Sequence, residues 1–169
     1  MEIIISLLIL CTYLLYVCFK FNIIPISISN TYYIIKWKPL FTLIISISAL
    51  LTLPRGMDVA SEKSDILLVP FLAVFGSLLV AVAPKVKDYE KTIHMVGAGI
   101  SGIFSQVWVL LYGNIYTLLL LIIPLILGII SLIKYKEGNL EERLDKLCFV
   151  FWTEIICLGT FYINLIQTI

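Results

Sequence analysis

One carboxylate, Glu154, is the group best placed to do chemistry in this 169-residue chain. It lies seven residues after Leu147, where a long apolar stretch begins, and so about 10 Å along a helix that rises 1.5 Å per residue. A carboxylate near the middle of a bilayer costs about 2.5–3.5 kcal/mol, and it usually faces a protein interior, is paired or is protonated. Glu154 could therefore bind a proton, a cation or a ligand. It could equally be a protonated side chain that hydrogen-bonds a Ser, Thr or Trp of a neighbouring helix, and the sequence leaves both interpretations open.

A second set of candidate residues lies on one face of another apolar stretch, at helical spacing. Small residues on a membrane helix let a neighbouring backbone approach closely. We therefore favour a packing face here over a face that lines a ligand site. Gln106 lies off this face and is a further polar side chain that needs a partner. The face consists of His94, Gly97, Ala98, Ser101, Ser105, Trp108 and Tyr112.

Two motif matches in the same stretch lack the context that their chemistry needs. Residues 97–102, GAGISG, fit G-x-G-x-x-G, but a dinucleotide site requires a strand before the glycines and a helix that opens at them. Residues 99–102, GISG, resemble the G-x-S-G motif of rhomboid intramembrane proteases, which also have six spans. Such a site needs a histidine on the sixth span. The single histidine, His94, instead stands about 10 Å from Ser101 along one helix, so we assign no catalytic residue.

The chain has few of the residues that commonly bind metals or cofactors, with one histidine and four cysteines. Zinc-dependent membrane hydrolases of the alkaline-ceramidase and adiponectin-receptor-like superfamily use several histidines, and one histidine cannot build such a site. The four cysteines include no C-x-x-C pair. We therefore predict no metal site and no cofactor. The net charge of +1 gives no reason to expect a nucleic-acid partner.

Membrane helices must position these side chains. Hydrophobic residues make up 61% of the chain and charged residues 14%, whereas a soluble domain carries about a quarter charged residues. A transmembrane helix needs about 20 predominantly apolar residues. We predict an all-α, polytopic transmembrane helix bundle with six spans, forming one integral membrane domain over residues 1–169. The predicted spans are 3–19, 34–54, 66–84, 93–112, 115–133 and 147–169.

Local signals suggest where several of these helices end or bend. The turn signal Pro54-Arg55-Gly56 should end the second span, and a polar loop should follow it. Pro124 should kink the fifth span, because proline removes a helical donor. Gly138 can end the fifth helix. Asn139 can then cap the sixth helix, with Glu142 in its first turn, so that this helix starts below the bilayer and runs on into the span.

Basic residues alternate between the gaps that separate the spans. Ten of the twelve Lys and Arg residues lie in the first, third and fifth gaps, and only Arg55 and Lys63 lie in the others. Short loops rich in Lys and Arg remain cytoplasmic. We therefore predict a multi-pass protein of the cell membrane (the inner or plasma membrane), with both termini outside the cytoplasm.

The first gap carries a candidate interfacial loop with the sequence SISNTYY at 27–33. Its polar side chains are Ser27, Ser29 and Asn30, and the aromatic pair Tyr32 and Tyr33 should sit at the level of the lipid headgroups. The loop could contact a lipid headgroup or simply anchor the chain at the interface. It could also form a re-entrant turn.

This heptapeptide resembles the S-I-S-x-x-Y-Y segment that follows the first span in a group of small bacterial polytopic membrane proteins. An acidic residue that opens their third span and a later histidine are similar to Asp65 and His94. The resemblance implies a polytopic membrane protein and brings no known activity.

The preferred function is that of a small, non-enzymatic integral membrane component that binds a lipid or a membrane partner protein, with a homo-oligomer as one form of assembly. A channel or proton-coupled transporter that uses Glu154 is the first alternative. An intramembrane enzyme that uses Ser101, His94 or Glu154 is the second.

Overall fold

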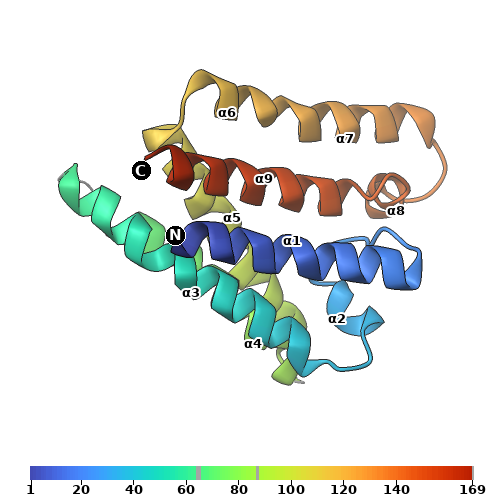
Figure 1. Ribbon diagram of the computed structural model, residues 1–169. Coiled ribbons are helices and arrows are strands. Elements are labelled where there is room, and N and C mark those ends of the chain that lie inside the picture. The colour runs from blue at the N-terminus through green and yellow to red at the C-terminus, as the bar shows by residue number, and fades with distance from the viewer. Residues whose placement is uncertain (64–65, 87, 169) are drawn as a thin grey trace.

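The computed structural model describes residues 1–63, 66–86 and 88–168, and over these ranges the chain is helical with no strand (Figure 1). Six helical stretches are long and apolar enough to cross a membrane, which confirms the predicted all-α bundle. Asp65, part of the resemblance noted above, lies outside the described residues, as do Lys87 and Ile169. The six stretches are Glu2–Phe21 (α1), Pro39–Glu62 (α3), Leu68–Lys85 (α4 and η1), Glu90–Tyr112 (α5), Ile115–Lys134 (α6 and α7) and Phe149–Gln167 (α9).

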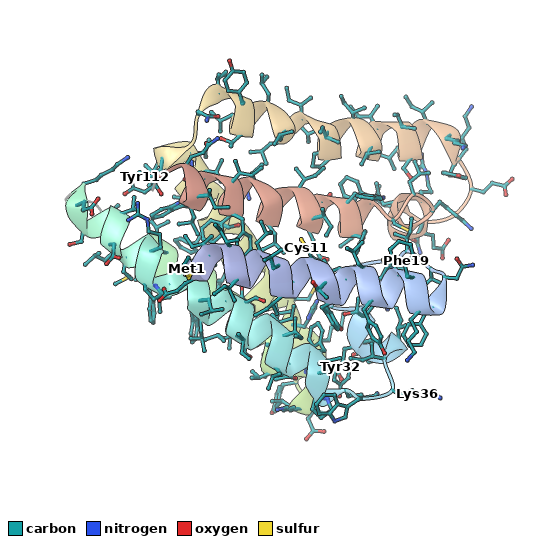
Figure 2. All side chains as sticks on the ribbon, in the orientation of Figure 1. Met1, Cys11, Phe19, Tyr32, Lys36 and Tyr112 are labelled. Atoms are coloured by element: carbon teal, nitrogen blue, oxygen red, sulfur yellow. The ribbon has the colours of Figure 1, made fainter. Side chains whose placement is uncertain are left out.

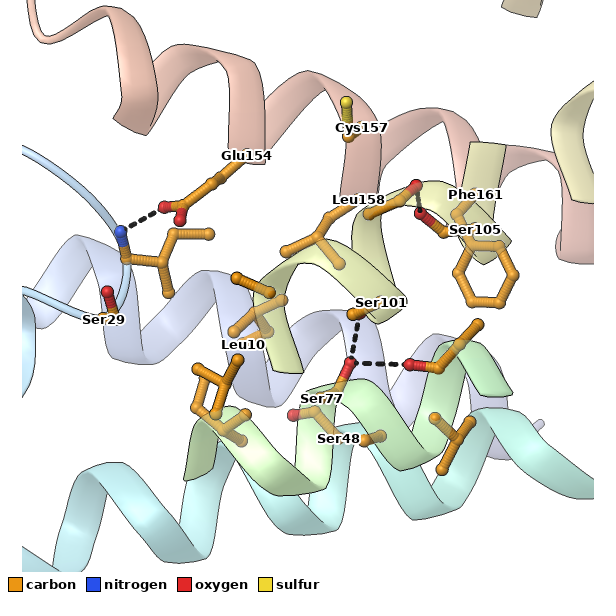
Figure 3. A pocket seen from close by; sticks show the side chains of 18 of the residues that line it. Leu10, Ser29, Ser48, Ser77, Ser101, Ser105, Glu154, Cys157, Leu158 and Phe161 are labelled. Carbon is orange, nitrogen blue, oxygen red and sulfur yellow. Dashed lines mark hydrogen bonds between the residues drawn. The ribbon is translucent and has the colours of Figure 1, made fainter. Parts of the chain in front are cut away.

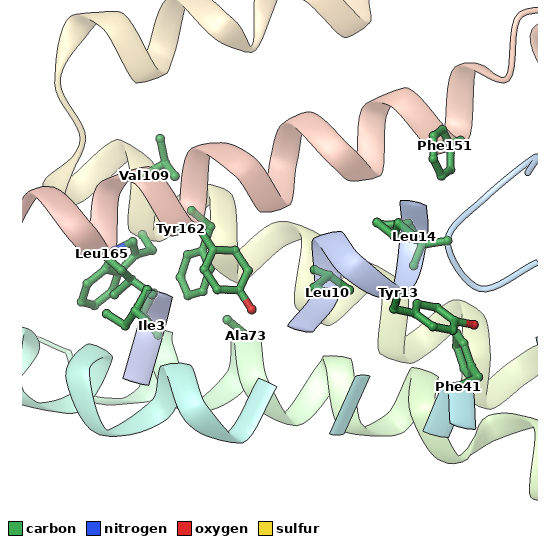
Figure 4. Close-up of a cluster of buried hydrophobic side chains, with 14 of the residues drawn as sticks. Ile3, Leu10, Tyr13, Leu14, Phe41, Ala73, Val109, Phe151, Tyr162 and Leu165 are labelled. Carbon is green, nitrogen blue, oxygen red and sulfur yellow. The ribbon is translucent and has the colours of Figure 1, made fainter. Parts of the chain in front are cut away.

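Five of these stretches form a closed ring. Helix α5 packs between α4 and α9, α9 also contacts α1, and α3 joins α1 to α4. The fifth stretch lies outside this ring, mainly against α9, as the separate upper arm in Figure 1 shows. Side chains from all five ring helices meet in the interior, including Leu10, Phe41, Ala73, Val109 and Phe151 (Figure 4).

Large apolar side chains also cover the outside of the bundle (Figure 2). Phe19 on α1 is 81% exposed, and Leu125 and Ile133 on the outer arm are each about two-thirds exposed. An aqueous surface rarely carries so much continuous apolar area. The outer surface therefore fits a hydrocarbon solvent, as expected of a multi-pass membrane protein.

The second span differs most from its prediction. The helix predicted at 34–54 begins only at Pro39 and continues through Pro54 to Glu62, so the predicted turn and polar loop after Pro54 are wrong. Gly56 serves a different purpose, because a Cβ there would lie 2.7 Å from the Cβ of Pro70. The glycine lets α3 approach α4, and membrane helices tolerate an internal proline where neighbours satisfy the freed groups. At the other end, Thr31–Ile34 forms a separate short helix, α2.

The last two spans are each divided. The fifth consists of α6 (Ile115–Leu120) and α7 (Ile122–Lys134). The break at residue 121 lies three residues before Pro124, as expected because proline has no N–H to bond the carbonyl of the preceding turn. Asn139 caps a helix through a reciprocal capping box with Glu142, which confirms the predicted cap. That helix, α8 (Leu140–Asp145), does not run on into the span as predicted, because Cys148 adopts a left-handed conformation with φ 50° before α9 begins.

Candidate functional site

A cavity of about 300 Å³ lies inside the ring, and side chains of α1, α3, α4, α5 and α9 line it together with Ile28 and Ser29 (Figure 3). Its wall is mostly apolar, with residues such as Leu10, Val80 and Phe161. Polar side chains interrupt this wall at intervals. They are Ser29, Ser48, Thr52, Ser77, His94, Ser101, Ser105, Thr153, Glu154 and Tyr162.

One end of the cavity brings together three regions that the sequence presents separately. The carboxylate of Glu154 on α9 accepts a hydrogen bond of 2.5 Å from the backbone N–H of Ile28 (Figure 3). The hydroxyl of Ser29 lies 3.3 Å from Nε2 of His94 on α5. Glu154, His94 and the segment at 27–33 therefore belong to one site, which we call the cavity mouth and define as Ile28, Ser29, His94 and Glu154.

The segment at 27–33 is held in this position by its own hydrogen bonds. Ser27 accepts a bond of 3.1 Å from the N–H of Asn30, and the hydroxyl of Thr31 donates to the carbonyl of Ile28 at 2.6 Å. Tyr13 of α1 donates to the same Thr31 hydroxyl at 2.8 Å. Ile28 and Thr31 are buried. This part of the segment thus turns into the bundle and does more than line an interface.

The aromatic end of the segment points the other way. Tyr33 is exposed, and its hydroxyl donates to Glu90 at the start of α5. The ammonium group of Lys38 lies 4.8 Å from the ring centre of Tyr32 and 5.7 Å from that of Tyr33. The two tyrosines therefore pack around Lys38. Neither tyrosine lines the cavity wall.

The predicted face of α5 both packs against a neighbouring helix and lines the cavity. Toward α4 it is a packing face, since a Cβ on Gly97 would lie 2.7 Å from the Cβ of Leu79. The hydroxyls of Ser101 and Ser77 also share a hydrogen bond of 2.8 Å there. Ser101 and Ser105 line the cavity as well, so the same helix face borders an open space.

Gln106 does not line the cavity itself but hydrogen-bonds two residues that do. Its amide donates to the carbonyl of Cys157 at 3.1 Å and to the hydroxyl of Ser105 at 3.4 Å. Gln106 therefore ties α5 to α9 and does not line the cavity. These bonds satisfy its amide nitrogen, whereas its Oε1 has no hydrogen-bond partner among the described residues.

Ser48 is a cavity residue that the sequence did not single out. It is 3% exposed, and its hydroxyl has no hydrogen-bond partner among the described residues. Its backbone carbonyl is satisfied, because the hydroxyl of Ser6 donates to it at 2.7 Å. Ser48 lies between Ser46 and Thr52 in one apolar stretch, and only the closed ring shows that Ser48 and Thr52 face the cavity whereas Ser46 does not line it.

A second hollow, of about 510 Å³, adjoins the cavity mouth on the side of the first and third gaps. We call it the vestibule and define it by the residues that line it. Ser29 and His94 line both hollows, so the vestibule and the cavity adjoin at these two side chains. The vestibule residues are Ser27, Ser29, Asn30, Tyr33, Ala83, Pro84, Asp88, Glu90, Lys91 and His94.

The geometry also bears on the catalytic alternatives. The hydroxyl of Ser101 pairs with Ser77, whereas His94 contacts Ser29, so Ser101 and His94 form no nucleophile–base pair. Within the described residues, no three His, Cys, Asp or Glu side chains gather as a metal ion would require. The site thus offers hydrogen-bonding groups and one carboxylate around an apolar space.

No protein-family model matches the chain, and no curated protein or solved structure is significantly similar to it.

Proposed function

We propose that this protein is a non-enzymatic membrane binding protein whose ligand enters the cavity with an apolar part and places a polar group at the cavity mouth. The observation that carries this proposal is the meeting of the 27–33 segment, α5 and α9 at the end of an apolar cavity. Small-molecule sites are typically concave and mostly apolar, with a few convergent polar groups that fix orientation.

The size and chemistry of the cavity support a ligand over simple packing. Its volume of about 300 Å³ falls at the lower end of the range for ligand sites. Protein interiors otherwise contain few voids larger than a water molecule. The unpartnered hydroxyl of Ser48 supports the same conclusion, because a buried polar group normally has a partner and a ligand could provide it.

Two glycines of α5 allow a matched test. A Cβ on either Gly99 or Gly102 would meet no atom within 4 Å, but Gly102 lines the cavity and Gly99 is exposed on the outside. Gly102→Leu should therefore fill the cavity, and Gly99→Leu should add an equal side chain to the outer surface. Both changes alter the intrinsic helix propensity of α5 in the same way.

The probe is a medium-chain alcohol with a diazirine in its chain, and the protein is reconstituted in lipid nanodiscs. In the unmodified protein, photolabelling should reach cavity residues such as Ser105 and Cys157. Gly102→Leu should reduce this labelling about tenfold, which corresponds to about 1.4 kcal/mol of binding free energy. Gly99→Leu should leave it unchanged. Equal labelling of all three proteins, confined to outward-facing residues, would overturn the proposal.

The vestibule and cavity mouth lie on the side of the basic gaps, which we propose is the cytoplasmic side of the cell membrane. The test uses a variant without native cysteines that carries Glu2→Cys or Glu137→Cys, since both positions are exposed. A membrane-impermeant maleimide should label the first in intact cells and leave the second unlabelled. Labelling in the opposite pattern would show that the orientation is reversed.

A further inference from the structure

The structure indicates the charge of the ligand, an inference that rests on the proposed binding function. We infer that the ligand is a cationic amphiphile that places an ammonium group at the cavity mouth and a mainly apolar chain, with one hydrogen-bonding group for Ser48, in the cavity. The charges around the two hollows, the composition of the cavity wall and the unpartnered Ser48 hydroxyl carry this inference.

The charged groups around the two hollows are predominantly acidic. Asp88 and Glu90 line the vestibule, and Glu154 lies just inside the cavity mouth. Lys91 is the one Lys or Arg among the described residues that line either hollow. Three carboxylates against one ammonium group favour a ligand with a positive charge.

None of the described residues that line the cavity is a lysine or an arginine. The one histidine on its wall, His94, contacts Ser29. The carboxylate of Glu154 accepts one backbone N–H, from Ile28, which leaves most of its acceptor capacity unused. A charge in an apolar environment is costly unless it is paired and hydrogen-bonded. A ligand ammonium group at the cavity mouth would provide the missing counter-charge and further donors.

Other lysines near the two hollows do not change the excess of acidic over basic groups that line them. Lys36, Lys38 and Lys85 belong to the same basic side of the protein, but none of them lines the cavity or the vestibule. Lys38 instead lies over the rings of Tyr32 and Tyr33. The lysines can attract anionic lipid at the membrane surface, whereas the entrance to the cavity favours the opposite charge.

Ser48 supplies an independent sign that a ligand reaches into the cavity. Its side chain is almost fully buried, its hydroxyl lacks a partner and it lines the cavity wall on α3 (Figure 3). Glu154 approaches the cavity from α9, so the two groups face the same space from different helices. A chain that fills this space and carries a hydrogen-bonding group could satisfy the serine.

The experiment compares three photoreactive probes with the same diazirine chain and different head groups: a neutral alcohol, a quaternary ammonium and a sulfate. Nanodiscs of uncharged lipid keep the membrane surface from selecting among them. Labelling of cavity residues by the ammonium probe should exceed labelling by the sulfate probe by about tenfold, as expected for one charge-assisted contact.

Glu154→Gln is the matched variant, because it removes the charge and keeps an oxygen that can accept the Ile28 N–H. It should abolish most of the preference for the ammonium probe over the sulfate probe. Glu137→Gln, an exposed position in the fifth gap, should preserve the preference.

The outcomes separate this inference from the function on which it rests. Cavity labelling by the alcohol without a preference for the ammonium probe would overturn the inference and leave the binding function standing. A preference for the sulfate probe would assign the cavity to an anionic amphiphile. Absence of cavity labelling by every probe would overturn both the binding function and the inference. A preference that survives Glu154→Gln would overturn the placement of the ammonium group beside Glu154.

Discussion

The two sides of α5 both carry glycine and serine, but these small residues have opposite effects on the two sides. Toward α4, glycines bring two backbones into contact, and a Cβ on Gly76 would lie 2.4 Å from the backbone nitrogen of Ser101. Toward the centre of the ring, Gly102 leaves a space that no neighbouring atom enters within 4 Å of a Cβ. We call these the closed side and the open side of α5. A small residue in a membrane helix can therefore mean either tight contact or a cavity.

The polar groups of the two sides differ in the same way. On the closed side, Ser77 and Ser101 satisfy each other at 2.8 Å. On the open side, Ser48 lacks a partner, and Glu154 has one backbone donor. Mutually satisfied groups hold helices together, whereas unsatisfied groups around a space can receive the ligand that we propose.

The largest expected effect is on the closed side. Gly76→Ala should destabilise the protein by about 3 kcal/mol, because the new methyl group meets backbone atoms that cannot move without separating α4 from α5. The free energy of unfolding in detergent micelles measures this change. Gly99→Ala, on the outer surface, is the control and should not destabilise the protein. If both variants are as stable as the unmodified protein, α4 and α5 are not in close contact.

The next effect concerns the open side and the 27–33 segment. Glu154→Leu removes the acceptor for the Ile28 N–H, and an unsatisfied buried donor costs about 2 kcal/mol. The amide of Ile28 should then exchange hydrogen about 30-fold faster, the factor that corresponds to this free energy. Glu154→Gln should restore slow exchange because its amide oxygen can still accept. Unchanged exchange in Glu154→Leu would mean that this bond does not hold the segment.

The smallest effect again concerns the closed side. Ser77→Ala removes the hydrogen bond to Ser101 and should destabilise the protein by about 0.6 kcal/mol, the average for such bonds between membrane helices. An effect as large as that of Gly76→Ala would show that the hydroxyl pair, not backbone contact, sets the approach of the two helices.

Local signals predicted much of the helical framework and failed where a neighbour mattered. Asn139 and Glu142 form the expected capping box because a cap depends on residues three apart. Pro54-Arg55-Gly56 was misread as a turn, because the contact of Gly56 with Pro70 and the continuation of α3 depend on another helix. The predicted entry of α8 into the last span failed at Cys148, where nothing in the residue type signals a left-handed conformation.

The candidate site shows the same division. Glu154, His94 and Ser29 were each singled out for their chemistry, and each lies at the cavity mouth. Gln106 lies off the cavity, Tyr32 and Tyr33 lie outside it, and Ser48 was missed. Residue type identifies a group that can act but does not show which others it meets.

The sequence alone determined the apolar composition, the six spans and the cap of α8, because hydropathy and capping depend on neighbouring residues. Only the tertiary structure decided that Ile28 meets Glu154, 126 residues away, and that Gly76 closes a contact where Gly102 leaves a space. The reason is physical. Every span must be apolar to enter the membrane, so hydropathy cannot encode which helices become neighbours. That choice depends on the shapes and polar groups of faces that meet only when the ring closes.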